Sequence, residues 1–165
     1  MKTKLILLFV ASVFGVSNLI AQDCNQNLSL FNDSAKADIF EDALPRYKTL
    51  IEECPKINIV LYQRGEKMLD QLTDAEEDEV KQKEFANMLI ENFKLRLEHF
   101  PDESPVGKIY VDIGKVMYEH RIGTTEQKFQ FFEDAWNNDP ENFKDPKGLY
   151  EYFLLFDKLV DAGNK

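Results

Sequence analysis

A set of regularly spaced residues between Phe40 and Pro55 restricts the fold of this chain more than any other feature. Ala43, Tyr47 and Leu50 follow Phe40 at intervals of three and four, so they lie on one face of a helix. The small side chain of Ala43 lets a preceding antiparallel helix approach closely, and Pro55 stops the helix. Such a helical hairpin does not bury its apolar face alone, which predicts a stack of hairpins with an extended surface.

The first 21 residues have the three regions of a secretory signal peptide. Lys2 and Lys4 form a basic start, the stretch 5–16 is apolar, and Ala21 offers a small residue for cleavage. The apolar stretch is shorter than the roughly 20 residues that a membrane-spanning helix needs. We therefore expect export after cleavage near Ala21, a mature domain over residues 22–165 without a membrane span, and a location in the bacterial periplasm.

Two other interpretations of this start stay open. One is a signal anchor that is not cleaved. The other is a lipoprotein modified at Cys24, although the acidic Asp23 stands where a small residue is expected.

The charge of the chain limits its partners. There are 30 acidic and 20 basic residues, a formal net charge of −10, and cleavage of the signal would remove two lysines and no acid. Nucleic acids and anionic membranes bind basic surfaces, so we expect neither as a partner. The acids serve either a binding role or only the solubility of exposed helical faces.

Cys24 and Cys54 are the two cysteines of the chain. In an exported protein a disulfide is the default expectation. Cys24 precedes the first expected helix and Cys54 ends the second, and these two positions are neighbours in an antiparallel hairpin. We predict a Cys24–Cys54 bridge, with two separately packed thiols as the alternative.

Apolar residues recur at three and four along the rest of the chain, which predicts an all-α fold. Pro45 should kink the second helix or delay its start. Thr73 and Glu76 form a capping-box pattern for the fourth helix, and Ser104 with Pro105 suits the start of the fifth. Thr124 or Thr125 can cap the sixth. The seven helices are expected over residues 28–37, 39–53, 59–72, 74–99, 105–120, 126–137 and 147–160.

These patterns resemble the tetratricopeptide repeat, a helical hairpin of about 34 residues. The resemblance is most specific in the residues from Phe40 to Pro55. Further on, Tyr110, Ile113 and Gly114 resemble the opening of the motif, and the closing half follows with Phe132, Ala135 and Pro140, whereas Lys128 departs from the expected small residue. In between, the repeat is suggested only by Leu61, Gly65, Phe93 and Pro101 and carries extra residues around 73–83.

The resemblance implies antiparallel hairpins stacked as a short right-handed solenoid. The repeats would cover residues 24–57, 58–103 and 105–142, followed by a final helix over 147–160. The chain also resembles exported repeat proteins of Bacteroidota-type bacteria. An irregular helical bundle is the alternative architecture.

Candidate catalytic groups are few. His99 and His120 fall at predicted helix ends, where a partly charged imidazole is favourable, and neither belongs to a metal-binding motif. The sequence has no glycine-rich phosphate loop, no serine elbow motif, and no cysteine with a clear histidine partner. We expect no enzymatic activity, no metal and no cofactor.

The resemblance also implies a binding groove, because relatives line a concave surface with the first helix of each repeat. On this alignment the groove residues are Asn25, Leu28, Asn32, Tyr62, Glu66, Leu69, Lys108, Val111, Lys115 and Tyr118. The two lysines suggest an extended peptide that carries an acidic group. Alternatively these residues are ordinary surface.

Aromatic residues crowd the last third of the chain, and residues 131–132 and 152–156 are apolar at adjacent positions that one helical face does not hide. Another subunit or further repeats could cover the excess on the last helix. We expect a non-catalytic protein-interaction scaffold. The alternatives are a helical domain that binds a small apolar ligand and the structural leading segment of a larger repeat protein.

Overall fold

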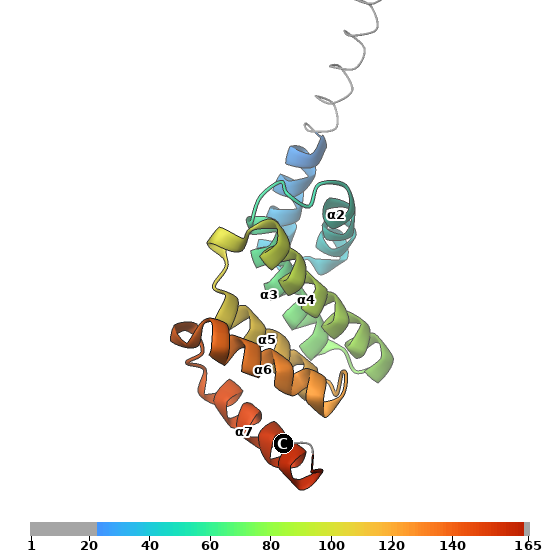
Figure 1. Cartoon of the computed structure of the whole chain (residues 1–165). Helices are drawn as coiled ribbons and strands as arrows, with labels where there is room; N and C mark the ends of the chain where they lie inside the picture. The colour runs from blue at the N-terminus through green and yellow to red at the C-terminus, as the bar shows by residue number, and fades with distance from the viewer. Residues whose placement is uncertain (1–22, 164–165) are drawn as a thin grey trace, which may run out of the picture. The chain divides into compact units, whose positions relative to one another are not determined.

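The structure is a computed structural model that describes residues 23–163, and within this range it is all-α with no strand (Figure 1). The prediction of an all-α chain with seven helices is confirmed. The helices are one over residues 23–36, α2 (Phe40–Glu53), α3 (Val60–Ala75), α4 (Glu79–His99), α5 (Val106–Glu119), α6 (Thr125–Asn138) and α7 (Pro146–Asp161), with short 3-10 turns η1 (Pro101–Glu103) and η2 (Pro140–Asn142). The predicted signal peptide lies outside the described residues.

The connection between α3 and α4 differs from the sequence prediction. Thr73 does not cap α4, because α3 continues through it to Ala75 and its hydroxyl donates to the Leu69 carbonyl at 2.7 Å. Thr73 is buried, and this bond to the preceding turn satisfies its hydroxyl inside the helix. The N-cap of α4 is Asp78, whose carboxylate accepts two backbone amides of the first turn.

The other two predicted helix starts have different outcomes. Thr124 caps α6 in a complete capping box with Gln127, as the sequence allowed. The prediction for α5 is wrong by one position, because Pro105 is its N-cap rather than its first helical residue. Ser104 is instead buried, and its hydroxyl accepts a hydrogen bond from Arg96 Nε at 3.3 Å.

The described chain divides into two compact units between Arg64 and Gly65, within α3. In the first unit, the apolar face of α2 is buried as its spacing predicted: Ala43, Tyr47 and Leu50. The ring of Phe31 in the 23–36 helix packs against Tyr47 with ring centroids 6.0 Å apart. Pro45 lies inside α2, which nevertheless begins at Phe40.

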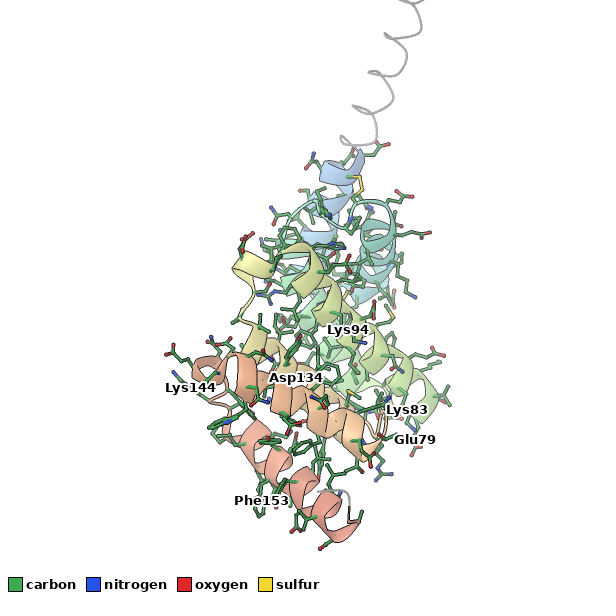
Figure 2. All side chains as sticks on the ribbon, viewed as in Figure 1. Glu79, Lys83, Lys94, Asp134, Lys144 and Phe153 are labelled. Atoms are coloured by element: carbon green, nitrogen blue, oxygen red, sulfur yellow. A yellow bond between two sulfur atoms is a disulfide. The ribbon has the colours of Figure 1, made fainter. Side chains whose placement is uncertain are left out.

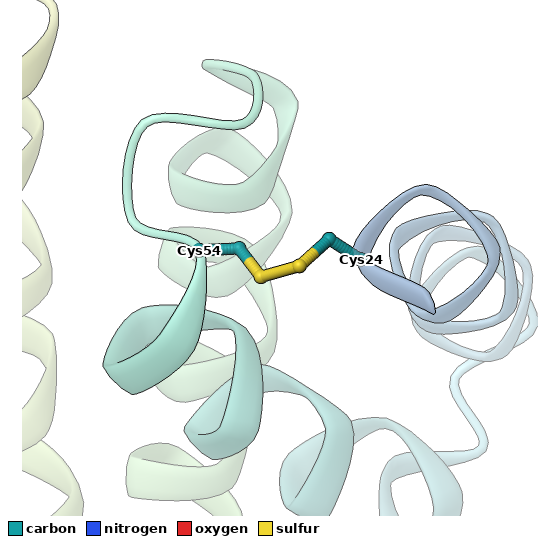
Figure 3. The surroundings of a disulfide bond; sticks show 2 residues. All are labelled: Cys24 and Cys54. Atoms are coloured by element: carbon teal, nitrogen blue, oxygen red, sulfur yellow. A yellow bond between two sulfur atoms is a disulfide. The ribbon is translucent and has the colours of Figure 1, made fainter. Parts of the chain in front are cut away.

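The cysteines join the two ends of this hairpin (Figure 3). The Cys24 and Cys54 sulfurs lie at disulfide-bonding distance, and the two Cα atoms are 6.3 Å apart. Cys54 directly follows α2, while Cys24 lies near the described start of the 23–36 helix. The pairing predicted from the antiparallel arrangement is therefore the one that the structure contains.

In the second unit, α5 packs against α4, α6 and α7 (Figure 1). Gly114 permits a close approach of α5 and α6, because a Cβ at this position would lie 2.8 Å from two carbons of the Phe132 ring on α6. Gly148 on α7 is similarly close to Val111 on α5. The core around these contacts consists of Val111, Phe129, Phe132, Ala135, Phe143, Leu155 and Leu159.

We expect Gly114→Ala to lower the free energy of unfolding by about 1–3 kcal/mol, because the added methyl group overpacks the contact with Phe132. Chemical denaturation followed by circular dichroism measures the change. Phe132→Leu, which removes the ring, should cost less in the Gly114→Ala background than in the wild type. Additive effects of the two substitutions would contradict the proposed clash.

We expect Cys54→Ser to destabilise the first unit by roughly 3–4 kcal/mol, because the bridge closes a loop with a sequence separation of 30 residues. Thermal unfolding of the oxidised protein, the reduced protein and the variant measures this. The reduced wild type should resemble the variant, and a non-reducing mass measurement should find no free thiol. Equal stability of all three forms would rule out a stabilising bridge.

Candidate functional site

The structure distributes the predicted groove residues over both units. In the first unit, Asn25 is exposed and Asn32 accepts a hydrogen bond from Arg64 Nε at 3.2 Å. Tyr62 is completely buried, and its hydroxyl donates to the Pro55 carbonyl at 2.8 Å. The side chain of Tyr62 therefore supports the α2–α3 connection and offers no surface to a partner.

In the second unit, three of the predicted groove residues, Glu66, Lys108 and Lys115, belong to one set of interacting charges. Tyr118 is half-buried, and Lys158 Nζ lies 5.6 Å from the centre of its ring. Leu69 and Val111, also predicted for the groove, are buried in the core.

We call this set of interacting charges the charged face. It combines residues from α3, α4, α5 and the start of α7. Its six carboxylates and four cations are Glu66, Asp70, Asp112, Glu119, Asp145, Glu151, Arg96, Lys108, Lys115 and Lys147.

The lysines of the charged face are all held by carboxylates. Lys108 Nζ lies 2.5 Å from Asp112, one helical turn away on α5. Lys115 bridges Asp112 at 3.9 Å and Asp145, the N-cap of α7, at 3.3 Å. Lys147 on α7 pairs with Glu119 at the end of α5. These contacts connect α5 to the start of α7.

Arg96 is paired as well, with Glu66 at 3.2 Å across the α3–α4 hairpin. Burial raises the pKa of Glu66, and the nearby positive charges of Lys108 and Arg96 offset only part of that rise. All four cations of the charged face therefore already contact a carboxylate.

Two carboxylates remain without a cation. Among the ion pairs of residues 23–163, none includes Asp70 or Glu151. Burial raises the pKa of Asp70, and the neighbouring carboxylates of Asp74 and Glu119 raise it further. The charged face thus has two more carboxylates than cations.

Glu151 has the least favourable surroundings of these acids. It is 4% exposed, and its Oε2 atom is buried without a hydrogen-bond partner in the described structure. Burial raises the pKa of Glu151 to about 7, and the negative charge of Glu119 adds to the rise against the opposing effect of Lys147. Glu151 is therefore a candidate functional group that the sequence analysis did not identify.

A sequence signal for the charged face was present. Lys108, Asp112, Lys115 and Glu119 recur at intervals of four, three and four, so alternating charges follow one face of α5. Glu66 and Asp70 on α3 have the same helical spacing. The burial of Glu151 had no such signal, because it depends on how closely α7 approaches α5.

The histidines lie at helix ends, as predicted. His99 is the last residue of α4, and His120 is the C-cap of α5. His120 contributes to a cleft of about 220 Å³ whose other lining residues are Glu79, Gln82, Lys83, Glu119 and Arg121. Over residues 23–163, no three His, Cys, Asp or Glu side chains are grouped so that they could hold a metal ion. The absence of catalysis and of a cofactor stays a prediction.

A second candidate surface follows the outer side of α7. Leu149, Phe153, Phe156 and Val160 are between 39% and 63% exposed and recur at four, three and four residues. We call these four residues the apolar stripe. Phe153 projects from α7 into open space (Figure 2).

The remaining aromatic residues of this region are divided between core and surface. Phe132 is buried, and Tyr152 packs partly buried against Phe129 and Phe143. Trp136 on α6 is 51% exposed and meets Phe143 edge-on. The sequence predicts that one helical face cannot bury all the apolar residues of 152–156. This is confirmed on α7, where Phe153 and Phe156 of the apolar stripe are exposed to solvent.

No protein-family model, curated protein or solved structure matches this chain. Within the described part of the chain, no helix is both long enough and apolar enough to cross a membrane. The candidate sites therefore rest on the chemistry and the geometry of this chain alone.

We expect the stability of the second unit to fall as the pH rises through about 7. The folded-state pKa of Glu151 lies above its ordinary value of 4.5, so its stabilising effect is complete below that value and is lost as the group ionises. Glu151→Gln should therefore raise the melting temperature at pH 8, by the equivalent of on the order of 1–3 kcal/mol, and change it little at pH 5.

Thermal unfolding across this pH range tests the assignment, with Glu84→Gln on the exposed surface of α4 as the control. The control should follow the wild type at every pH. A stabilisation by Glu151→Gln that does not vary with pH would show that ionisation of Glu151 is not the cause.

Proposed function

We propose that this protein is a non-catalytic scaffold for protein–protein interaction in the bacterial cell envelope, built from hairpins like those of tetratricopeptide repeats. The observation that carries the proposal is the apolar stripe of α7. Exposed apolar residues scattered singly need no explanation, whereas four at helical spacing form a continuous contact surface.

The geometry of the stripe favours an amphipathic helix of another protein as the partner. Intervals of four, three and four align apolar side chains along a helix in the way that helix–helix seams require. The opposite side of α7 already packs in this manner, with Leu155 and Leu159 buried in the core. Large aromatic side chains such as Phe153 also supply much contact area for little loss of side-chain entropy.

Two features support a location in the envelope. The first 21 residues have the organisation of a signal peptide. The Cys24–Cys54 pair lies at bonding distance, and such bridges persist in oxidising compartments such as the periplasm. Both agree with the proposed export and cleavage near Ala21.

The two alternative functions are supported differently. A small apolar ligand would be enclosed by aromatic side chains, but Trp136 lies half-exposed at the surface. A structural role, in which another copy or further helical repeats cover α7, would use the same apolar stripe. This structural role is therefore one of the outcomes that the experiment below distinguishes.

The test is affinity capture from an envelope extract with the wild type and with Phe153→Ser/Val160→Ser. We expect the double variant to lose a partner that the wild type binds, because polar side chains interrupt the stripe at two of its four positions. The matched control is Leu30→Ser/Val80→Ser, which replaces two exposed apolar residues elsewhere and should retain the partner. Circular dichroism confirms the folding of each variant.

Light scattering of the purified protein separates the outcomes. A wild-type dimer that becomes a monomer in Phe153→Ser/Val160→Ser would replace the proposed hetero-partner with a second copy of this chain. Retention of the same partners by both double variants would refute a binding role for the stripe.

A further inference from the structure

We propose that the cleft between the start of α4 and the end of α5 binds a carboxylate group, which Lys83 and Arg121 hold. The cleft has a volume of about 220 Å³, and every side chain that lines it is polar or charged. None of its lining residues belongs to α7, which carries the apolar stripe. The proposal therefore goes beyond the scaffold function and does not depend on it.

The cleft is open to solvent and small. Glu79 and Lys83 lie on the first two turns of α4 and are exposed (Figure 2), and Arg121 is exposed just after α5. Sites for drug-sized ligands have volumes of roughly 300–1,000 Å³, so this cleft suits a single charged group and the few atoms next to it. Asp78 already binds the first amides of α4, which leaves the side chains to hold a ligand.

Two cations of the cleft are available to a ligand. Among the ion pairs of residues 23–163, none includes the side chain of Lys83 or of Arg121. They differ in this from Lys108 and Lys115, the lysines that the sequence suggested for an acidic ligand, because carboxylates of the chain hold both of those.

The charges around the cleft favour a ligand with one negative charge. Glu119 is paired with Lys147, so Glu79 is the acid of the cleft that has no cation partner among the described residues. Counting His120 as neutral, Lys83 and Arg121 then exceed Glu79 by one positive charge. A carboxylate matches this excess, whereas a phosphate monoester carries roughly −1.5 to −2 at neutral pH and would be repelled by Glu79. A guanidinium also matches the planar geometry of a carboxylate.

The backbone at Arg121 provides evidence independent of charge. Arg121 has a φ of 55° and follows the C-cap residue of α5. The Ile122 amide donates to the Met117 carbonyl at 2.9 Å, and the Arg121 amide donates to the Tyr118 carbonyl at 3.4 Å. These two bonds define a Schellman motif, in which the position of Arg121 is usually glycine because a Cβ is unfavourable at positive φ.

The choice of arginine at this position needs an explanation outside the fold. Asp38 is the other non-glycine residue with positive φ in the described chain, and the short polar side chain of aspartate tolerates this conformation. Arginine has no such tolerance. A residue kept where glycine would relieve strain indicates a requirement for its side chain. The Arg121 side chain lines the cleft, so we assign that requirement to a ligand.

The experiment follows the backbone amides of residues 79–83 and 119–123 and the Arg121 Nε–Hε group by heteronuclear NMR at low ionic strength. One probe is propionate, a free acid. The other is a blocked alanine–glutamate–alanine peptide, and the blocked alanine–glutamine–alanine peptide is its neutral control. We expect both acids to shift these signals in a saturable manner at millimolar concentration, and the control to leave them unchanged.

The outcomes separate the two sources of a carboxylate. Tighter binding of the acidic peptide would identify an acidic side chain of a protein as the ligand, and equal binding of both acids would identify a free small acid. Either result supports the site. No shift with either acid, or the same shift with the neutral peptide, would overturn the proposal.

Two double variants separate a defined site from a general effect of charge. Lys83→Gln/Arg121→Gln should weaken the binding of both acids about tenfold, measured from the remaining amide signals. Lys81→Gln/Lys144→Gln removes the same charge from exposed positions outside the cleft and should change the affinity by less than about twofold. Equal weakening by both pairs would show that only net charge matters and would overturn the site.

Arg121→Gly tests the argument from the backbone. We expect this variant to have a higher melting temperature than the wild type, because glycine adopts a positive φ without a steric cost, and yet to lose the binding. A basic side chain near a helix C-terminus can also stabilise the helix itself. A lower melting temperature of Arg121→Gly would show that the arginine serves the fold, and would overturn its assignment to a ligand.

Discussion

The close contact between α5 and α6 at Gly114 is the constraint on which the second unit depends. Without a Cβ at this position, the Phe132 ring lies against the α5 backbone, and the aromatic core forms around it. Gly148 permits a similar approach of α7 to Val111 on α5. Because interiors are packed at crystal-like density, these two small residues help to set the distances from α5 to α6 and from α5 to α7.

The close approach of α7 to α5 has an electrostatic cost at Glu151. When α7 approaches α5 closely, Glu151 leaves solvent and loses the hydration of its carboxylate. Ion pairs between α5 and the start of α7 compensate for several neighbouring groups, because Lys115 on α5 holds Asp145 and Lys147 on α7 holds Glu119. The buried Oε2 atom of Glu151 gains no hydrogen-bond partner in the described structure. The charged form of a carboxyl group in this position is disfavoured, so the pKa of Glu151 is raised and protonation relieves the cost.

Local periodicity was sufficient to predict much of the fold. Ala43, Tyr47 and Leu50 are buried together because a helix returns side chains to the same face every three to four residues. The predicted N-cap at Thr73 was wrong. The sequence there matches a capping-box pattern, but Thr73 is buried within α3. The sequence prediction also placed Tyr62 in a groove, although its ring fills the interior. In both cases burial, which sequence spacing does not specify, decided the role of the residue.

The sequence by itself determined the helical class, most helix ends, the pairing of Cys24 with Cys54 and the acidic character of the chain. The helical class and most helix ends follow from interactions between residues close in sequence, and the acidic character follows from composition. The cysteine pairing follows from the antiparallel arrangement expected of the first hairpin. The tertiary structure decided that Glu151 is buried, that the carboxylate of Glu119 raises the pKa of both Asp70 and Glu151, and that Phe153 stays exposed. Such contacts depend on the distance and orientation of whole helices, and these result from packing and desolvation rather than from local spacing.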